Sequence, residues 1–93
     1  MEKAKRREAV ATIRNRRGLH ARASAKVVEA AARFQSRITV AKDGQAVDAR
    51  SIMGLMMLAA GLGSQIRITA EGPDSDQALA AILALVDANF GEE

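Results

Sequence analysis

Apolar and polar residues alternate with a period of two in four short segments of the chain. This pattern is typical of strands that bury one face of a sheet, and it predicts strands over residues 8–14, 37–42, 45–49 and 65–70. The alternation is clearest in the last segment, where Ile66, Ile68 and Ala70 share one face. Asp43-Gly44 separates the second segment from the third and predicts a two-residue hairpin turn, because both residues tolerate positive φ.

Two further segments repeat their apolar residues with helical spacing. The first predicts a helix over residues 21–34. Its expected buried stripe is Val27, Val28, Ala31 and Phe34. The second predicts a short helix over residues 52–60, which the Ser51 side chain can cap at its N-terminus. In that helix Leu55 and Leu58 are expected to face the core.

A last helical segment follows Asp74 and Gln77, whose spacing is that of a capping box, and runs to about residue 90. Its expected buried stripe is Leu79, Ile82, Leu83, Val86 and Phe90. The order of elements is therefore β-α-β-β-α-β-α. We expect an α+β fold, an open-faced β-sandwich in which three helices cover one face of a four-stranded antiparallel sheet.

Composition indicates one soluble domain over residues 1–93, with a basic arm at residues 1–7 that is expected to fray. The absence of cysteine excludes disulfides and thiolate metal sites. The longest apolar run, residues 52–63, is shorter than the about 20 residues that span a bilayer. Residues 1–10 lack the apolar stretch of a signal peptide. We therefore expect a cytoplasmic protein without membrane association.

Positive charge is concentrated at the beginning of the chain. Residues 1–22 carry a net charge of +6 and residues 23–93 a net charge of −3. This asymmetry favours an acidic partner or an anionic group near the N-terminal third. The alternative is a solvated arm that has no partner. The Asp and Glu residues of the C-terminal third show no metal-ligand spacing, and they are interpreted as a solvated face.

The one histidine, His20, follows Gly18 and opens the first predicted helix. The backbone N–H groups of Ala21, Arg22 and Ala23 then lack helical partners and form an anion site with the helix dipole. An imidazole at this place can act as a nucleophile whose phosphoryl group meets waiting donors, and the Arg22 guanidinium adds a fixed positive charge. The alternative is a surface or core histidine without chemistry.

Residues 18–22, Gly-Leu-His-Ala-Arg, resemble the active-site motif of the HPr family, the histidine phosphocarriers of the bacterial phosphotransferase system. Residues 51–58 resemble the family's regulatory serine and short second helix. The resemblance covers nearly the whole chain beyond residue 7, and the element order agrees with it. Residues 72–90 look closer to the nitrogen-related branch, often called NPr, than to the sugar-transport HPr.

The resemblance implies a carrier, not an enzyme. His20 would accept a phosphoryl group on Nδ1 from enzyme I, which is charged by phosphoenolpyruvate, and pass it to a histidine of an enzyme IIA protein. Arg22 would hold the phosphoryl oxygens. Ser51 would be the target of an HPr kinase/phosphorylase in some bacteria, although its role as an N-cap is a sufficient structural explanation. A monomer without cofactor or metal is expected.

Two residues depart from the family pattern. Ala23 stands where proline usually follows the arginine, which restores a backbone N–H and loosens the φ restraint of the first turn. Arg17 stands where small polar residues are common. A cation beside the histidine favours the phosphorylated form and disfavours a protonated ring. Neither change removes a group that phosphoryl transfer needs.

A docking surface is expected around the short second helix. With Leu55 and Leu58 inward, three apolar residues lie outward, where flexible methionines suit surfaces that bind several partners. The predicted surface is Ile52, Met53 and Met56, ringed by the positive charges of Arg17, Arg22 and Lys26. The alternative is a short helix that is buried on all sides.

Competing function classes fit the composition less well. A small basic nucleic-acid-binding module would need aromatic side chains for base stacking. The two aromatic residues, Phe34 and Phe90, lie on the buried helix stripes. A metal-dependent enzyme lacks ligands, since the chain has one histidine and no cysteine.

Overall fold

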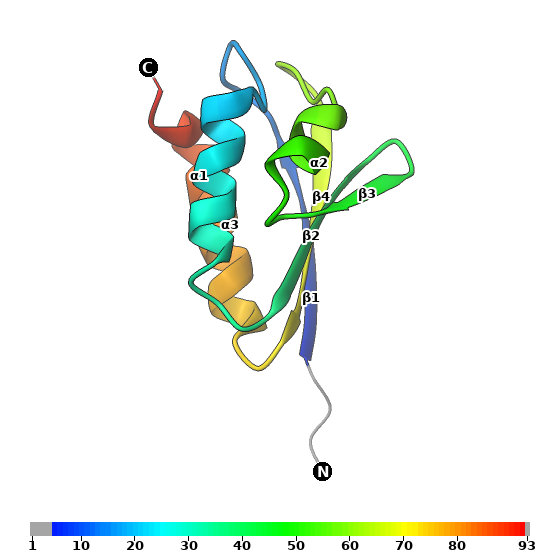
Figure 1. Ribbon diagram of the computed structural model, residues 1–93, viewed down its shortest axis with the longest axis vertical. Helices are drawn as coiled ribbons and strands as arrows, with labels where there is room; N and C mark the ends of the chain where they lie inside the picture. The colour runs from blue at the N-terminus through cyan, green and yellow to red at the C-terminus, as the bar shows by residue number, and fades with distance from the viewer. Residues whose placement is uncertain (1–4, 93) are drawn as a thin grey trace.

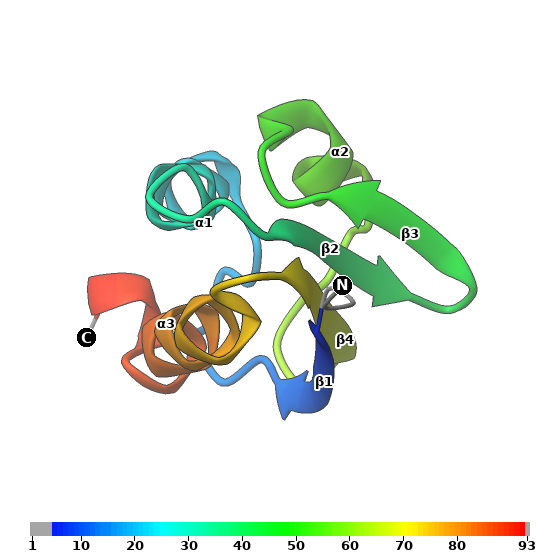
Figure 2. The ribbon, with the colours of Figure 1, turned by 90° about the horizontal axis from the view of Figure 1, so that it is seen from below.

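Four antiparallel strands form a single sheet with the order β1-β4-β2-β3 in the computed structural model, which describes residues 5–92 (Figure 1). The elements in chain order are β1 (Lys5–Thr12), α1 (Ala21–Ala31), β2 (Arg37–Lys42), β3 (Gln45–Asp48), α2 (Ile52–Met57), β4 (Gln65–Gly72), α3 (Ser75–Asp87) and a short 3-10 turn, η1 (Asn89–Gly91). Figure 2 shows the three helices on the same side of the sheet. The predicted α+β architecture and its element order are confirmed.

The first strand is longer at its N-terminal end than predicted. Lys5 is already paired with Gly72 of β4, and Arg7 with Ala70. The Arg7 side chain also donates a hydrogen bond of 2.6 Å to Asp76 at the start of α3. The prediction of a frayed arm is therefore wrong for residues 5–7, because pairing with β4 satisfies their backbone groups. The rest of the predicted arm, residues 1–4, lies outside the described residues.

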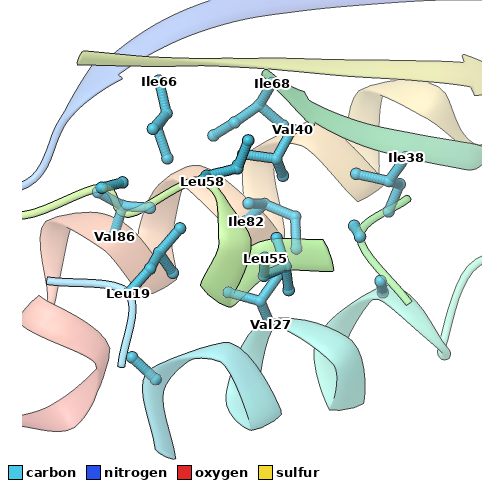
Figure 3. Packing of buried hydrophobic residues seen from close by; sticks show 14 of the residues in the cluster. Leu19, Val27, Ile38, Val40, Leu55, Leu58, Ile66, Ile68, Ile82 and Val86 are labelled. Atoms are coloured by element: carbon cyan, nitrogen blue, oxygen red, sulfur yellow. The ribbon is translucent and has the colours of Figure 1, made fainter. Parts of the chain in front are cut away.

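The core fills the space between the sheet and the helices. Ile66, Ile68 and Ala70 of β4 are all buried, as their alternation predicted, and Figure 3 shows Ile66 and Ile68 pointing toward side chains from the helices. Leu55 and Leu58 are buried as expected. The predicted helix stripes are buried in part. Their half-buried members are Val28, Phe34, Leu79 and Leu83, which pack at the edge of the core.

The predicted helix ends are less accurate than the helix positions. The helix α1 ends at Ala31, three residues before the predicted end, because the Arg33 and Phe34 amides bond to carbonyls three residues back in a tightened turn. The short helix α2 ends at Met57, and Ala59 after it takes a left-handed φ of 51°. This backbone turn releases the chain toward β4.

One predicted helix cap is confirmed and one is wrong. The Ser51 hydroxyl accepts a 2.9 Å hydrogen bond from the Gly54 amide at the start of α2. Asp74 makes no side-chain cap bond to α3. Its carboxylate accepts bonds of 2.9 Å from the amides of Gln35 and Ser36. The Ser36 hydroxyl donates a third bond to it of 2.5 Å. The orphan amides of the α1–β2 turn compete for this carboxylate, so the capping box does not form.

Candidate active site

A glycine brings the loop before α1 close to the end of α2. Gly18 has a φ of +64°, and a Cβ at this position would lie 2.2 Å from the carbonyl oxygen of Ala60. The adjacent Leu19 amide donates a 2.9 Å hydrogen bond to that same oxygen. Only glycine allows this approach without displacing backbone. The contact fixes where the next residue, His20, enters α1.

His20 is the N-cap residue of α1, with an extended backbone. The first helical hydrogen bond runs from the Ser24 amide to the His20 carbonyl at 2.8 Å. The amides of the intervening residues, Ala21, Arg22 and Ala23, therefore lie before the first turn's bonding begins. The imidazole makes no cap bond to them. Three N–H groups and the positive helix end are thus available to an anion beside the ring.

Of the three basic residues predicted to surround the histidine, two are exposed and one is half-buried. Arg17 and Arg22 are exposed, and neither pairs with a carboxylate within residues 5–92. Lys26 differs, because its ammonium donates a 2.6 Å hydrogen bond to the carbonyl oxygen of Phe90. It is half-buried, and it holds the C-terminal segment against α1. Arg22 is therefore the guanidinium of α1 that is available for a phosphoryl group.

A carboxylate from the C-terminal segment contacts the histidine. Glu92 Oε2 pairs with His20 Nε2, and the two side chains are 21% and 15% exposed. Asn15 Nδ2 donates to Glu92 Oε1 at 3.0 Å and to the Gly18 carbonyl oxygen at 2.9 Å. The hydrogen bond from His20, and then that from Asn15, hold the pKa of the Glu92 carboxyl below its usual value. The interpretation of the C-terminal acidic residues as a solvated face is wrong for Glu92.

Apolar side chains are exposed on α2 next to this site. Ile52, Met53 and Met56 lie outward with exposed fractions of 40%, 70% and 41%, as predicted. Met57 and Leu62 add to the same exposed set at 67% and 63%, and the sequence pattern did not identify them. A shallow hollow joins this helix to the histidine, and its lining includes Arg17, Leu19, His20, Met56 and Ala60. Of the predicted docking residues, Arg17 and Met56 line this hollow together with His20.

Comparisons with known proteins agree on one family. A family model described as PTS HPr component phosphorylation site matches residues 7–88. Phosphocarrier protein HPr of Cupriavidus necator is 52% identical over 81 residues, which cover 87% of this chain and 91% of that protein. The solved structure of HPr-C-His from Thermoanaerobacter tengcongensis superposes with a TM-score of 0.90 at 42% identity, covering 94% of this chain and 98% of the other.

The chain belongs to the HPr family of phosphocarrier proteins. Members of this family carry a phosphoryl group on histidine within the phosphotransferase system and are not enzymes. Enzyme I and enzyme IIA proteins are the general partners of the family. Phosphocarrier protein NPr of Shewanella violacea is also similar, with 46% identity over 81 residues and coverage of 87% of this chain and 89% of that protein. Family membership therefore does not distinguish the sugar-transport branch from the nitrogen-related branch.

Across residues 5–92, no group of three or more His, Cys, Asp or Glu residues is arranged to hold a metal ion. None of the helices in the described part of the chain has the length and apolar character needed to cross a bilayer.

Glu92 is the residue of this site that no local pattern could identify. It lies 72 positions after His20 in the chain. Its contact arises only because α3 returns along α1 and the segment after α3 turns toward the start of α1 (Figure 1). The sequence offers one hint of this contact, which is that Glu92 follows Phe90 and Gly91. Burial of Phe90 and the left-handed φ of Gly91 set the direction of the chain at that point.

Proposed function

We propose that His20 is the phosphoryl acceptor of this HPr-family protein. The group arrives on Nδ1 from phosphorylated enzyme I and leaves for a histidine of an enzyme IIA protein. The observation that supports this most directly is the position of His20 as the N-cap of α1 without a cap bond of its own. The amides that begin α1 are then left for the phosphoryl oxygens.

The transfer needs no cofactor. The lone pair of His20 Nδ1 forms a bond to phosphorus while the bond between phosphorus and the donor nitrogen breaks, and its electron pair returns to the donor ring. Charge on the phosphoryl oxygens is stabilised by the amides of Ala21, Arg22 and Ala23 and by the exposed Arg22 guanidinium. In the second transfer His20 is the donor, and a histidine of the enzyme IIA protein accepts the phosphoryl group by the same step.

Donor and acceptor share one docking surface in this proposal. It consists of the exposed Ile52, Met53 and Met56 of α2 together with Arg17 and Arg22, and two of these residues, Arg17 and Met56, line the hollow beside the histidine. A carrier must present one imidazole to two different proteins, so each partner excludes the other. Flexible methionines adapt to both, and the positive charges accelerate encounter with acidic partners.

Ser51 is proposed as a regulatory phosphorylation site for an HPr kinase/phosphorylase. Its hydroxyl already meets the Gly54 amide at the start of α2, where a phosphate would find the same donor. The modified residue would directly precede Ile52 and Met53, and its negative charge would repel an acidic partner from the docking surface. The fold tolerates this change because Ser51 stays at a helix N-terminus.

The branch of the family is a finer proposal. The resemblance of residues 72–90 to NPr favours the nitrogen-related regulatory branch, with the protein in the cytoplasm. The name of the Cupriavidus necator relative favours sugar-transport HPr. The two alternatives differ in the enzyme I and enzyme IIA proteins that react. Comparing transfer rates with purified donors and acceptors of each branch decides between them, since the true branch is expected to be the faster.

Phosphorylation of the protein is tested by incubating it with phosphoenolpyruvate and a catalytic amount of enzyme I. We expect the mass of the parent protein to increase by one acid-labile phosphoryl group and the mass of His20→Ala to stay unchanged. Circular dichroism of the variant serves as the control for folding. Acid-labile phosphate on folded His20→Ala would refute the assignment of the acceptor.

A further inference from the structure

The segment after α3 is a strained and anchored turn. We name residues 89–92 the C-terminal hook. Asn89, Phe90 and Gly91 have consecutive left-handed φ values of 54°, 55° and 79°. Residues other than glycine rarely adopt this conformation, and it persists where surrounding contacts enforce it. Such strain is often associated with functional sites, so the group that the hook carries needs an explanation.

Core packing of Phe90 and three hydrogen bonds enforce the conformation of the hook. The Phe90 side chain is 0% exposed in the core. Lys26 of α1 donates a 2.6 Å hydrogen bond to the Phe90 carbonyl oxygen. The amides of Gly91 and Glu92 bond to the carbonyls of Ala88 and Asn89 at 2.9 Å each. A Cβ on Gly91 would lie 2.8 Å from the Lys26 ammonium, so this glycine permits the close approach. The hook is therefore held against α1.

The hook delivers one functional group, the Glu92 carboxylate. Its Oε2 meets His20 Nε2, and its Oε1 accepts the bond from Asn15. Asn15 is 4% exposed and also bonds to the Gly18 carbonyl, so it ties the carboxylate to the loop that positions the histidine. Figure 1 shows the segment after α3 beside the start of α1. Among residues 5–92, the ring is hydrogen-bonded through Nε2 and not through Nδ1.

We propose that Glu92 is a positioning residue for phosphoryl transfer, which holds the His20 ring in the tautomer with its proton on Nε2 and its lone pair on Nδ1. The inference rests on the proposed function of His20. A neutral imidazole carries one N–H and one lone pair, and the hydrogen bond to one nitrogen decides which is which. An ionised carboxylate can only accept, so it selects the proton on Nε2.

This arrangement also accounts for the charge that develops during transfer. When the Nδ1 lone pair bonds to phosphorus, the ring becomes positively charged while the Nε2 proton stays in place. No proton has to leave before or during the step. The Glu92 carboxylate faces that positive charge, as the aspartate of a Ser-His-Asp triad faces its imidazolium. The hydrogen bonds from His20 and Asn15 hold the pKa of the Glu92 carboxyl below its usual value, and the charge of Arg17 adds to this effect.

The test uses two variants and one control. Glu92→Ala removes the acceptor, Glu92→Gln keeps an acceptor oxygen without the charge, and Glu29→Gln neutralises an exposed glutamate on α1. Ring nitrogen-15 shifts of His20 at alkaline pH report the tautomer. Initial rates of phosphorylation by enzyme I report the transfer.

We expect the Nε2–H tautomer alone in the parent and in Glu29→Gln, and a mixture of both tautomers in Glu92→Ala. The transfer rate of Glu92→Ala falls by roughly 10-fold or more, as expected when a group that orients a reactive histidine is lost. Glu92→Gln, whose amide can donate as well as accept, selects the Nε2–H tautomer less completely and loses part of the rate. A purely structural role of the hook would lower stability without moving the tautomer ratio.

Three results would overturn the inference: an unchanged tautomer ratio in Glu92→Ala, a changed ratio with an unchanged rate, or faster transfer. Faster transfer would mean that the carboxylate competes with the phosphoryl group for the site. The proposed function fails separately, if the parent protein takes up no phosphoryl group on His20, and the tautomer measurement remains interpretable in that case.

Discussion

Asp74 and Glu92 are two carboxylates that stand at opposite ends of α3, and each binds a turn from a distant part of the chain. Asp74 accepts hydrogen bonds from the Ser36 hydroxyl and from the amides of Gln35 and Ser36. Glu92 meets the His20 ring and the Asn15 side chain. In both cases the hydrogen bonds hold the pKa of the carboxyl below its usual value. The two contacts therefore affect the pKa of their carboxyls in the same direction.

The two ends of α3 differ in the groups that are hydrogen-bonded to the carboxylates. The amides and the hydroxyl around Asp74 do not change charge near neutral pH, so that contact can only connect the α1–β2 turn to the start of α3. The partner of Glu92 is an imidazole, which can exchange a proton and accept a phosphoryl group. The same type of contact thus stabilises the fold at one end and orients a reactive ring at the other.

Replacing the histidine should give the largest difference between the effects at Glu92 and at Asp74. We expect His20→Ala to lose phosphoryl transfer completely and to keep the fold. The pKa of the Glu92 carboxyl should rise toward its usual value, because the hydrogen bond from His20 is the largest cause of its depression. Carbon-13 titration of the side-chain carboxyls of glutamate and aspartate measures this rise. The pKa of Asp74 serves as the internal control and should not move.

Removing the guanidinium on α1 should also affect only the His20 end. Arg22→Ala is expected to slow transfer by about 100-fold, the scale for losing one donor that stabilises a developing anion. Its stability should stay near that of the parent, because Arg22 is exposed. Arg33→Ala, another exposed arginine near α1, is the matched control. Equal transfer rates in parent and Arg22→Ala, at the same enzyme I concentration, would contradict this role.

The opposite result is expected at the Asp74 end. Asp74→Ala should lower the melting temperature at pH 7 and leave the transfer rate unchanged. Because the folded pKa of Asp74 lies below its usual value of 3.8, its stabilising contribution is present above that value and is lost as the pH falls. The gap between parent and variant should therefore narrow below about pH 4.

Calorimetry across this pH range measures the gap. The control is Asp76→Ala, which removes an exposed ion pair with Arg7 and should cost little at any pH. A gap for Asp74→Ala that stays constant down to pH 2 would contradict the role of the ionised carboxylate.

How far the sequence predicts this molecule depends on the range of each interaction. The alternation of β4 and the Asp43-Gly44 turn are local, and both are confirmed, with φ values of 52° and 82° at the turn. The Ser51 cap spans three residues and is confirmed as well. In contrast, Asp74 satisfies a capping pattern locally but is bound by amides 38 and 39 positions away. A local pattern cannot weigh such a competitor.

The candidate site shows the same division. His20 and Arg22 lie within one motif at the start of a helix, so their proximity follows from a local prediction. The outward side of α2 is also predictable, since Leu55 and Leu58 fix the inward side. Glu92 depends on the length of α3 and on three left-handed residues that turn the chain after it. These properties emerge only when the whole fold is assembled.

The smallest effect on stability is expected on the docking surface. Met53→Glu should weaken binding of enzyme I and of the enzyme IIA protein by about 10-fold each, which corresponds to about 1.4 kcal/mol. The free energy of unfolding should change by less than about 0.5 kcal/mol, because Met53 is 70% exposed. Val10→Glu is the control, as it changes an apolar residue of β1 that is 52% exposed. Equal losses in both variants would contradict the location of the surface.

The most direct test of the central claim is to locate the phosphoryl group in the phosphorylated protein. Nitrogen-15-labelled protein is phosphorylated with phosphoenolpyruvate and enzyme I, and one-bond coupling between phosphorus-31 and the ring nitrogens is recorded. We predict that phosphorus is coupled to His20 Nδ1 and that Nε2, which faces Glu92, carries the proton. Coupling to Nε2, or phosphate on a residue other than His20, would contradict the account.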